Sequence, residues 1–261
     1  MNRKPYATDL TAKQWELIDS VIPYPVPKGR PYKWPIREIL NAILYVLRSG
    51  CSWRLLPHDF PPWQTVYYLF NKWSKDGTWA EINDALRKKV RLNEGRDENP
   101  GAGIIDSQSV KTTERGGLRG YDAGKKINGR KRHILVDTLG LIIGVLVHEA
   151  GIQDRDGAKL LLSGLFGKLP GLQLIWADGG YAGKLIDRVK EQFQWTLEIV
   201  KRNKGAAGFQ LLPRRWVVER TFAWLTRYRR LSKDYEFRTA NSEALIYIAM
   251  INNMARRLAS S

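Results

Sequence analysis

The sequence predicts an α/β protein, in which a mixed sheet flanked by helices follows an all-α N-terminal region. Two observations predict this class. Through about residue 99, apolar residues recur at helical spacing. After residue 100, an initial meander gives way to short β-prone segments that alternate with helical ones, the pattern of a layered α/β domain. The polar, glycine-bearing segment RLNEGRDENPGAG separates the two patterns, so we expect domains at 1–99 and 100–261.

The N-terminal region is expected to begin with two helices. Thr11 and Gln14 have capping-box spacing, which opens a helix that runs through Val21. After a proline-rich connector, the segment IREILNAILYVLRS repeats apolar residues at helical spacing. Gly50 follows it, and glycine is the residue that most easily adopts the left-handed conformation after a helix.

Two more helices are expected before the boundary. One covers residues 63–75, and the next begins at a second capping-box pair, Thr78 and Glu81, and runs to about Val90. The elements expected after residue 100 are, in order, strand IIDSQSV, a hairpin of RHILVD and LIIGVLVHEA, helix GAKLLLSGLF, strand LQLIWAD, helix KLIDRVKEQF, strand TLEIVKR, helix 214–231 and helix 241–258.

The charge balance predicts a polyanionic partner. The chain has 43 Lys+Arg against 26 Asp+Glu, a formal net charge of +17. Most of the excess lies in residues 111–133 and 201–261, so it is patterned. A folded protein with such basic stretches usually binds nucleic acid, here expected to be double-stranded DNA. Ten Trp and eleven Tyr indicate a sizeable folded body, which disfavours a histone-like binder.

Other functional classes are disfavoured by what the sequence lacks. The one cysteine, Cys51, excludes an internal disulfide framework and agrees with a reducing cytoplasm. With one Cys and three His, no zinc site of ordinary spacing can form. The longest apolar run, LGLIIGVLV, is too short for a membrane span, so no membrane partner is expected. No G-x-x-x-x-G-K-[ST] loop occurs, which disfavours an ATP-driven motor.

Two aspartates lie where open sheets bind ligands, near the carboxyl ends of strands. Asp178 follows LQLIWA and precedes two glycines, although a turn or cap role explains it equally well. Asp106 is followed by Ser-Gln-Ser-Val, so the strand continues through it, and an acid inside a strand is unfavourable. The other acids in this part of the chain are interpreted as structural or solvated: Asp122, Asp137, Asp154 and Asp156.

Glu219 stands within the most arginine-rich stretch, RRWVVERTFAWLTRYRRL. At 100° per residue, Arg215, Glu219, Thr226 and Arg230 share the side opposite the apolar arc, with Arg220 and Arg227 at its margin. An Arg215–Glu219 pair at i,i+4 explains the acid but not the surplus of arginines. A carboxylate that holds a metal beside a phosphate, flanked by arginines on the same phosphate backbone, explains both.

Three carboxylates on two strands and a helix suit phosphoryl transfer by two metal ions. Mg²⁺ prefers oxygen ligands, with Mn²⁺ as an alternative ion, and keeps several waters. Two such ions activate the attacking oxygen and stabilise the leaving one, so no protein nucleophile is required.

Three segments in this order resemble the catalytic motifs of bacterial insertion-sequence transposases of the Asp-Asp-Glu (DDE) type: GIIDSQSVKTT, LIWADGGYAG and RRWVVERTFAWLTRYRRL. The segment GKKINGRKRHILVDTLGLI is similar to the same group. The resemblance implies an RNase H-like core with Asp106, Asp178 and Glu219 as catalytic magnesium ligands. It also implies recognition of terminal inverted repeats, strand cleavage by water, and attack of the freed 3′-hydroxyl on target DNA.

The chain departs from a broader signature of related transposases, which reads Tyr, two residues, Arg, three residues, Glu, six residues, Lys. Arg215 and Glu219 fit this signature, but Leu212 stands at the Tyr position and Thr226 at the Lys position, followed by Arg227. Which basic residue holds the phosphate is therefore left open by the resemblance.

Two basic regions are expected to contact DNA phosphates. The first is a glycine-punctuated loop with Lys125, Lys126, Arg130, Lys131 and Arg132, for which a merely solvated loop is the alternative. The second is the helix that bears Arg215, Arg220, Arg227 and Arg230. The helices of residues 1–99 are expected to read sequence in the major groove.

The combined prediction is a magnesium-dependent DNA transposase of the bacterial cytoplasm and nucleoid, acting as a homodimer or larger assembly on paired ends. Two alternatives stay open. One is a repressor or domesticated relative that binds DNA without cutting it. The other is an RNase H-fold nuclease for RNA hybrids or junctions.

Overall fold

The computed structural model describes residues 3–23, 33–114, 117–200 and 214–260. The helices are α1 (Ala12–Asp19), α2 (Ile36–Ser49), α3 (Trp63–Lys75), α4 (Thr78–Asn93), α5 (Asp154–Leu165), α6 (Leu185–Phe193), α7 (Trp216–Thr226) and α8 (Thr239–Ser260). The strands are β1 (Ala102–Lys111), β2 (Gly120–Asp122), β3 (Ile127–Asp137), β4 (Ile142–Glu149), β5 (Leu174–Ala177) and β6 (Thr196–Ile199). Three short 3₁₀ turns are η1 (Trp53–Leu55), η2 (Gly179–Tyr181) and η3 (Arg229–Leu231).

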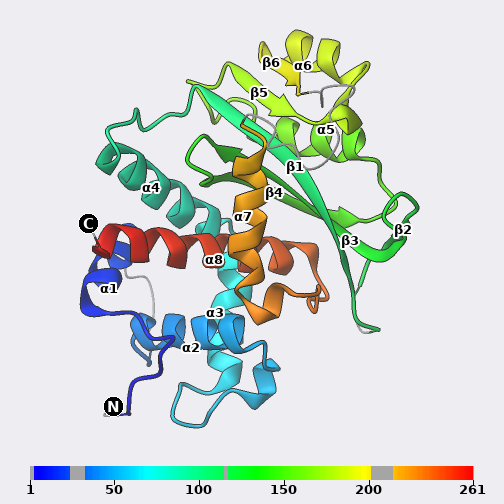
Figure 1. Ribbon diagram of the computed structural model, residues 1–261. Helices are drawn as coiled ribbons and strands as arrows, with labels where there is room; N and C mark the ends of the chain where they lie inside the picture. Colours follow the sequence, from blue (N-terminus) through cyan, green and yellow to red (C-terminus); the bar gives the residue numbers. More distant parts are fainter. Residues whose placement is uncertain (1–2, 24–32, 115–116, 201–213, 261) are drawn as a thin grey trace.

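A mixed sheet forms the centre of the second half of the chain, as predicted (Figure 1). β1 pairs antiparallel with β3 on one side and parallel with β5 on the other. β6 extends the sheet in parallel beyond β5, while β4 and β2 pair antiparallel with β3. β1 is therefore the strand at which the antiparallel meander meets the parallel part of the sheet.

Both faces of the sheet are covered, and neighbouring residues of β1 face opposite ways. Ile104 belongs to a hydrophobic cluster shared with α7, α8 and the N-terminal helices. The next residue, Ile105, belongs to a second cluster shared with α5 and α6. Strands buried on both faces read as continuous apolar runs, which is why β4 and the second half of β3 show little alternation in the sequence.

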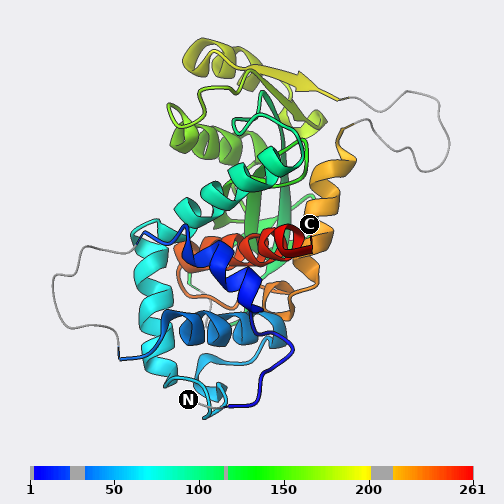
Figure 2. The same cartoon turned by 90° about the vertical axis from the view of Figure 1, so that its left-hand side faces the viewer.

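The last helix, α8, lies between α1–α3 and the sheet, whereas α4 lies beside the sheet and contacts it directly (Figures 1 and 2). The first hydrophobic cluster extends without interruption from Leu10 in the N-terminal region through Ile104 to Ala255 on α8. Asp137 at the end of β3 is buried and pairs with Arg91 of α4 at 2.8 Å. The division at residue 100 stays a prediction, and packing across it is extensive.

Side chains of α8 cover the outer edge of β4. Val147 N donates to Glu243 Oε1 at 2.8 Å, and Val145 N donates to the Tyr247 hydroxyl at 3.1 Å. Exposed edge amides would otherwise be free to pair with another chain. These contacts fix α8 to the sheet by polar bonds as well as by apolar packing.

Most predicted helix ends agree with the structure, with two exceptions. The capping box of Thr11 and Gln14 forms, and Gly50 is left-handed, with φ 76°. α4, however, begins after Gly77, and Thr78 donates from its hydroxyl to Asp76 at 2.7 Å, so the second predicted capping box is wrong. The expected helix 214–231 ends at Thr226 and resumes only as the η3 turn.

Candidate active site

Asp106 lies within β1, as the sequence predicted. Its backbone pairs with Ile134 of β3, and its side chain accepts a hydrogen bond from the amide of Ser107 at 2.7 Å. Burial raises the pKa of Asp106 to about 6, the nearby Asp178 charge also raises it, and Arg215 opposes the rise. A mostly buried carboxylate with a raised pKa in a polar cluster is typical of a functional position.

Asp178 directly follows β5, the parallel neighbour of β1. Ile104 and Trp176 are aligned in the two strands, so Asp106 and Asp178, each two residues further on, emerge side by side. Asp178 also caps the η2 turn by accepting from Gly180 N at 2.8 Å. The cap role and the place at the strand end therefore coexist.

Glu219 projects from the first turn of α7 and is exposed, as the helical wheel predicted. Arg215, just before α7, joins it to the two aspartates. Its Nη2 atom lies 3.5 Å from Asp106 Oδ2, 3.6 Å from Asp178 Oδ2 and 3.8 Å from Glu219 Oε1. The predicted i,i+4 pair exists, but the same guanidinium faces all three predicted acids. The structure thus brings together carboxylates from β1, the end of β5 and α7.

The three acids surround this guanidinium without meeting one another in a metal-binding cluster. Among the residues that the structure describes, no three His, Cys, Asp or Glu side chains lie close enough together to hold a metal ion. The donor set is nevertheless the right kind, because it consists of carboxylate oxygens turned toward one positive charge.

Asp154, which reads as a helix cap in the sequence, is a fourth carboxylate at the site. It begins α5, accepts from Ser107 Oγ at 2.8 Å, and lies 3.1 Å from Lys131 Nζ. A Cβ placed on Gly180 would be 3.0 Å from Asp178 Oδ1 and 3.7 Å from Asp154 Oδ2. Acids are common in the first turn of helices, where they interact favourably with the helix dipole, so the sequence gives no sign of a further role for Asp154. Only the fold reveals that Asp154 lies near Asp178.

Tyr181 lies inside the protein next to the same carboxylate cluster. Its side chain is almost fully buried, and its hydroxyl lies 3.5 Å from His133 Nδ1. Burial raises the pKa of the Tyr181 phenol well above its ordinary value, and the charges of Asp106, Asp154 and Asp178 raise it further. Tyr181 therefore stays protonated at neutral pH.

Five of the residues predicted to contact DNA keep exposed or partly exposed side chains: Lys125, Lys126, Arg215, Arg220 and Arg227. Lys125 Nζ donates to the carbonyl of Ser107 at 3.2 Å, beside the carboxylate cluster. Arg220 lies between the rings of Trp216 and Trp224, 4.6 and 4.7 Å from their centroids, and donates to Leu139 O.

The predicted basic loop around Arg130, Lys131 and Arg132 is wrong. These three residues belong to β3 and are buried, with relative exposures of 0%, 6% and 2%. Arg130 and Arg132 donate to backbone carbonyls of residues 231–237, and Lys131 donates to Ile152 O at 2.9 Å. Asp122, predicted to be solvated, is buried as well and accepts from Ser109 Oγ at 2.6 Å. These side chains are buried and bonded inside the protein, with only the Nε atom of Arg132 left without a partner among them, so these cations cannot reach a DNA backbone.

Arg230 is a second correction. The helical wheel placed it on the polar side with Glu219, but the helix ends four residues earlier. Arg230 is buried and pairs with Glu236 at 2.7 Å, while its neighbour Arg229 is exposed. The wheel ceases to apply at the end of α7, which no residue type in the sequence marks. Leu212, at the Tyr position of the broader signature, lies outside the described residues.

Comparison with known proteins decides the family. Residues 98–254, more than half of the chain, match the family model described as "Transposase DDE domain". The chain belongs to the DDE transposases. Residues 10–83 match the model described as "Putative transposase of IS4/5 family", which places the N-terminal helices in the same group. The mixed sheet and the family match agree with the predicted RNase H-like core.

Two relatives come from insertion element IS402 of Burkholderia cepacia. The chain is 30% identical over 108 residues to an uncharacterized 16.2 kDa protein of that element, covering 39% of this chain and 72% of the relative. It is 30% identical over 117 residues to the "Putative transposase for insertion sequence element IS402", covering 42% of this chain and 55% of that protein. The chain thus spans little more than half of the second relative. In the parts of the DDE transposase that the structure describes, no helix is long and apolar enough to span a membrane.

Proposed function

We propose that this chain binds the terminal inverted repeats of an insertion sequence, hydrolyses a phosphodiester at the element's end, and joins the freed 3′-hydroxyl to target DNA. One observation carries the proposal: the acids at the three DDE positions, Asp106, Asp178 and Glu219, come from three separate elements and face one guanidinium. A family match alone would leave open whether this copy keeps its catalytic acids in place.

The carboxylate cluster suits divalent metal ions. Three carboxylates face the single positive charge of Arg215, and oxygen is the ligand that Mg²⁺ prefers. Asp106, Asp178 and Glu219 would hold the ions, and Mn²⁺ would serve as well. Bound there, two ions would supply an activated attacking oxygen and stabilise the leaving oxygen of the cut strand.

The chain's own residues orient these acids and the substrate. Arg215 reduces the repulsion among the three carboxylates by facing each of them at 3.5–3.8 Å. Lys125, beside Ser107, places a second cation next to the same cluster. Both cations suit contacts to phosphate oxygens on either side of the scissile bond.

The remaining partners follow from charge and family. Lys125, Lys126, Arg220 and Arg227 would contact DNA phosphates, and the helices of residues 1–99 would read the inverted repeats. Two element ends require two active sites, so we expect a homodimer or larger assembly in the bacterial cytoplasm, on the nucleoid.

The test neutralises each acid while keeping its shape. Asp106→Asn, Asp178→Asn and Glu219→Gln are each compared with the full chain in a Mg²⁺-dependent cleavage assay on a plasmid that carries the element's own ends. Each substitution should lower end cleavage by more than about 100-fold, since even outer partners of metal ligands cost roughly 10–100-fold when lost. Asp187→Asn, at an exposed acid in the first turn of α6, is the matched control and should cleave normally.

The open alternatives give different outcomes in the same assay. Full cleavage by all three variants would overturn the site. DNA binding without cleavage by the unaltered chain would identify an inactive binder. Cleavage without joining of the 3′-hydroxyl end to a second DNA would identify a nuclease. Titration calorimetry with Mg²⁺ alone tests the metal site apart from activity, and the Asp106→Asn chain should bind it more weakly.

A further inference from the structure

The segment of residues 229–238 links α7 to α8, and its residues 233–237 alternate between exposed and buried. Asp234 and Glu236 are buried, whereas Lys233, Tyr235 and Phe237 are exposed. Alternation with a period of two is the pattern of extended backbone, which turns successive side chains to opposite sides. Lys233, Tyr235 and Phe237 therefore project on the side away from the protein interior.

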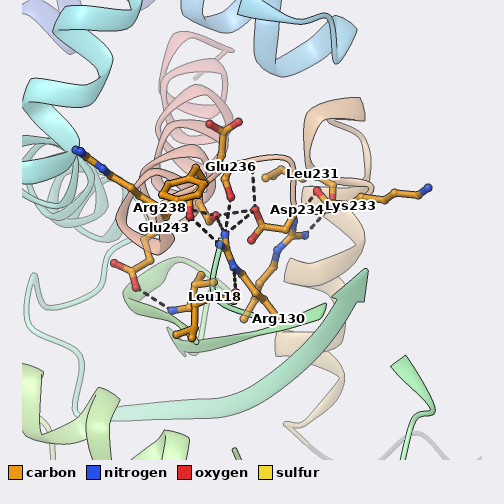
Figure 3. A network of polar contacts seen from close by, with 12 residues as sticks. Leu118, Arg130, Leu231, Lys233, Asp234, Glu236, Arg238 and Glu243 are labelled. Carbon is orange, nitrogen blue, oxygen red and sulfur yellow. Dashed lines mark hydrogen bonds and ion pairs between the residues drawn. The ribbon is translucent and has the colours of Figure 1, made fainter. Parts of the chain in front are cut away.

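Buried arginines of β3 hold this segment in shape (Figure 3). Arg130 donates to the carbonyls of Glu236 and Phe237 at 2.8 and 2.9 Å and lies 3.2 Å from Asp234 Oδ1. Arg132 donates to the carbonyls of Leu231 and Lys233 at 2.7 and 3.0 Å. The backbone beneath the exposed side chains is thus anchored to the central sheet. An ordered surface loses less conformational entropy when it binds a partner.

The exposed side chains of the segment carry only positive charge. Arg229, Lys233 and Arg238 are exposed, and both acids of the segment are buried. Phe237 has 71% of its surface exposed and Tyr235 36%, and the Tyr235 ring lies 5.2 Å from the Arg230 guanidinium, so the largest exposed apolar surface of the segment is that of Phe237. Cations next to exposed aromatic rings suit nucleic acid, because phosphates meet the cations and bases stack on the rings.

The segment is also placed along a path from the carboxylate cluster. Asp234 N donates to the carbonyl of Lys111 at 2.9 Å, which sets the segment beside the exposed end of β1. Lys111 lies five residues beyond Asp106, which is about 17 Å at roughly 3.4 Å per strand residue. Successive nucleotides of one strand are also about 3.4 Å apart in B-form DNA. Because Lys111 lies an odd number of residues from Asp106, its side chain faces the other side of β1, so DNA would have to follow the edge of the strand and would reach this segment about five nucleotides from the scissile phosphate.

We propose that Lys111, Lys233, Tyr235 and Phe237 form a DNA contact surface, with the two lysines on phosphates and the two rings on bases of an unpaired or distorted strand next to the cut. The place of this contact relative to the cut depends on the function proposed above, but the contact itself does not. Figure 3 shows the Lys233 and Arg238 side chains extending in opposite directions from the network, so Arg238 is not part of the surface.

A second copy of the chain fits this surface less well than DNA does. A twofold contact places the same patch against itself, so the exposed cations of the segment would face their own copies. DNA instead offers the opposite charge and the flat faces that the rings require.

Binding is measured by fluorescence anisotropy with the full chain in EDTA, so that no cleavage occurs. The probes are a labelled duplex of arbitrary sequence and the same duplex with an unpaired tail. Lys233→Ala should lower the slope of log affinity against log salt by about 0.7–0.9, the contribution of one phosphate contact. Phe237→Ala should weaken binding of the tailed duplex about 5- to 150-fold, and that of the plain duplex less.

Exposed residues of α5 and of the turn after it supply matched controls. Lys168→Ala and Leu160→Ala change exposed side chains of similar kind outside the segment and should leave affinity and salt slope unchanged. Thermal melting checks that every variant folds. Affinities and slopes equal to those of the unaltered chain for both Lys233→Ala and Phe237→Ala would overturn the proposal. So would a change in mass by light scattering with DNA binding intact, because it would identify a chain–chain interface.

Hydroxyl-radical footprinting on an element end then tests the position. Protection about five nucleotides from the cut should disappear in Lys233→Ala and persist in Asp106→Asn. Protection that is unchanged in Lys233→Ala would count against the surface. The unaltered chain could also bind DNA in EDTA as expected and yet show no cleavage with Mg²⁺. That outcome would reject the proposed function and leave the contact surface in place.

Discussion

Arg130 and Arg132 on β3, and Arg215 and Arg227 at the two ends of α7, belong to the two stretches that give the chain its positive charge, yet their surroundings differ. The β3 pair is almost fully buried and bound to backbone carbonyls and Asp234. Arg215 is half-buried against three acids, and Arg227 is exposed. The density of basic residues therefore predicts a polyanionic partner for the whole protein, but it does not show which arginines touch that partner.

Burial of a charge is tolerated only where hydrogen bonds replace those lost with water. The turn that follows α7 supplies them by directing carbonyls of residues 231–237 at β3. Burial lowers the pKa of Arg132 to about 10, with Asp234 opposing the shift, so Arg132 stays charged at neutral pH. The arginines on β3 thus hold the 229–238 segment against the sheet by hydrogen bonds to its carbonyls.

Arg130→Met tests most directly whether the buried arginines of β3 stabilise the fold, and we expect it to have the largest effect on the free energy of unfolding. The change leaves Asp234 buried without its cation, and removal of one partner of a buried pair costs about 3–5 kcal/mol. Urea unfolding followed by tryptophan fluorescence measures the loss. The double variant Arg130→Met/Asp234→Asn should recover part of it, since no unpaired charge then remains. A loss below about 1 kcal/mol, the level of many ordinary substitutions, would show that the β3 arginines do not fasten the segment.

Glu243 on α8 is a mostly buried acid, and it allows the effect of burying a charge to be tested on an acidic side chain. It is mostly buried and accepts from Val147 N, and burial raises its pKa to about 7. The folded state therefore favours the protonated form. The resulting stability is fully present below the ordinary pKa of 4.5 and is lost as the pH rises through about 7. The difference should be on the order of 2–3 kcal/mol between about pH 4.5 and pH 8.

Glu243→Gln should remove that contribution, because the amide oxygen can still accept from Val147 N while the side chain no longer titrates. Unfolding free energies of the variant and the unaltered chain are compared across this pH range. Glu81→Gln, at an exposed acid of α4, is the control and should show the same dependence of unfolding free energy on pH as the unaltered chain. Equal slopes for Glu243→Gln and the unaltered chain would contradict the assignment.

Local patterns predicted most of the secondary structure and the three acids. Gly50 ended α2, β1 continued through Asp106, and the turn after Asp137 formed the expected hairpin, because each depends on residues near one another in the chain. The order Asp106, Asp178, Glu219 carried the family resemblance, and the structure brings these residues to one guanidinium. The metal ions and the DNA contacts stay predictions.

Most of the misplaced residues depend on contacts that are distant in sequence. Arg130 reads as a surface cation until residues 231–237 fold over β3. Asp154 reads as a helix N-terminal charge until α5 packs beside η2. Arg230 reads as a helix residue because nothing local marks the end of α7, whereas its pairing with Glu236 turns it inward. A single sequence shows propensity and periodicity, but not which distant carbonyl or carboxylate will compensate a buried charge.

Arg227→Ala carries the smallest expected effect on stability and completes the comparison. The side chain is exposed, and the contact with Arg48 involves only the backbone carbonyl of Arg227, which the substitution keeps. The free energy of unfolding should change by less than about 0.5 kcal/mol. If Arg227 meets a phosphate, binding to duplexes of any sequence should weaken alike and the salt slope should fall by about 0.9. Arg130 would then affect unfolding and Arg227 binding. If Arg227→Ala instead destabilised the chain and left the salt slope unaltered, Arg227 would have a structural role like that of Arg130. Arg227 of α7 would then not contact DNA.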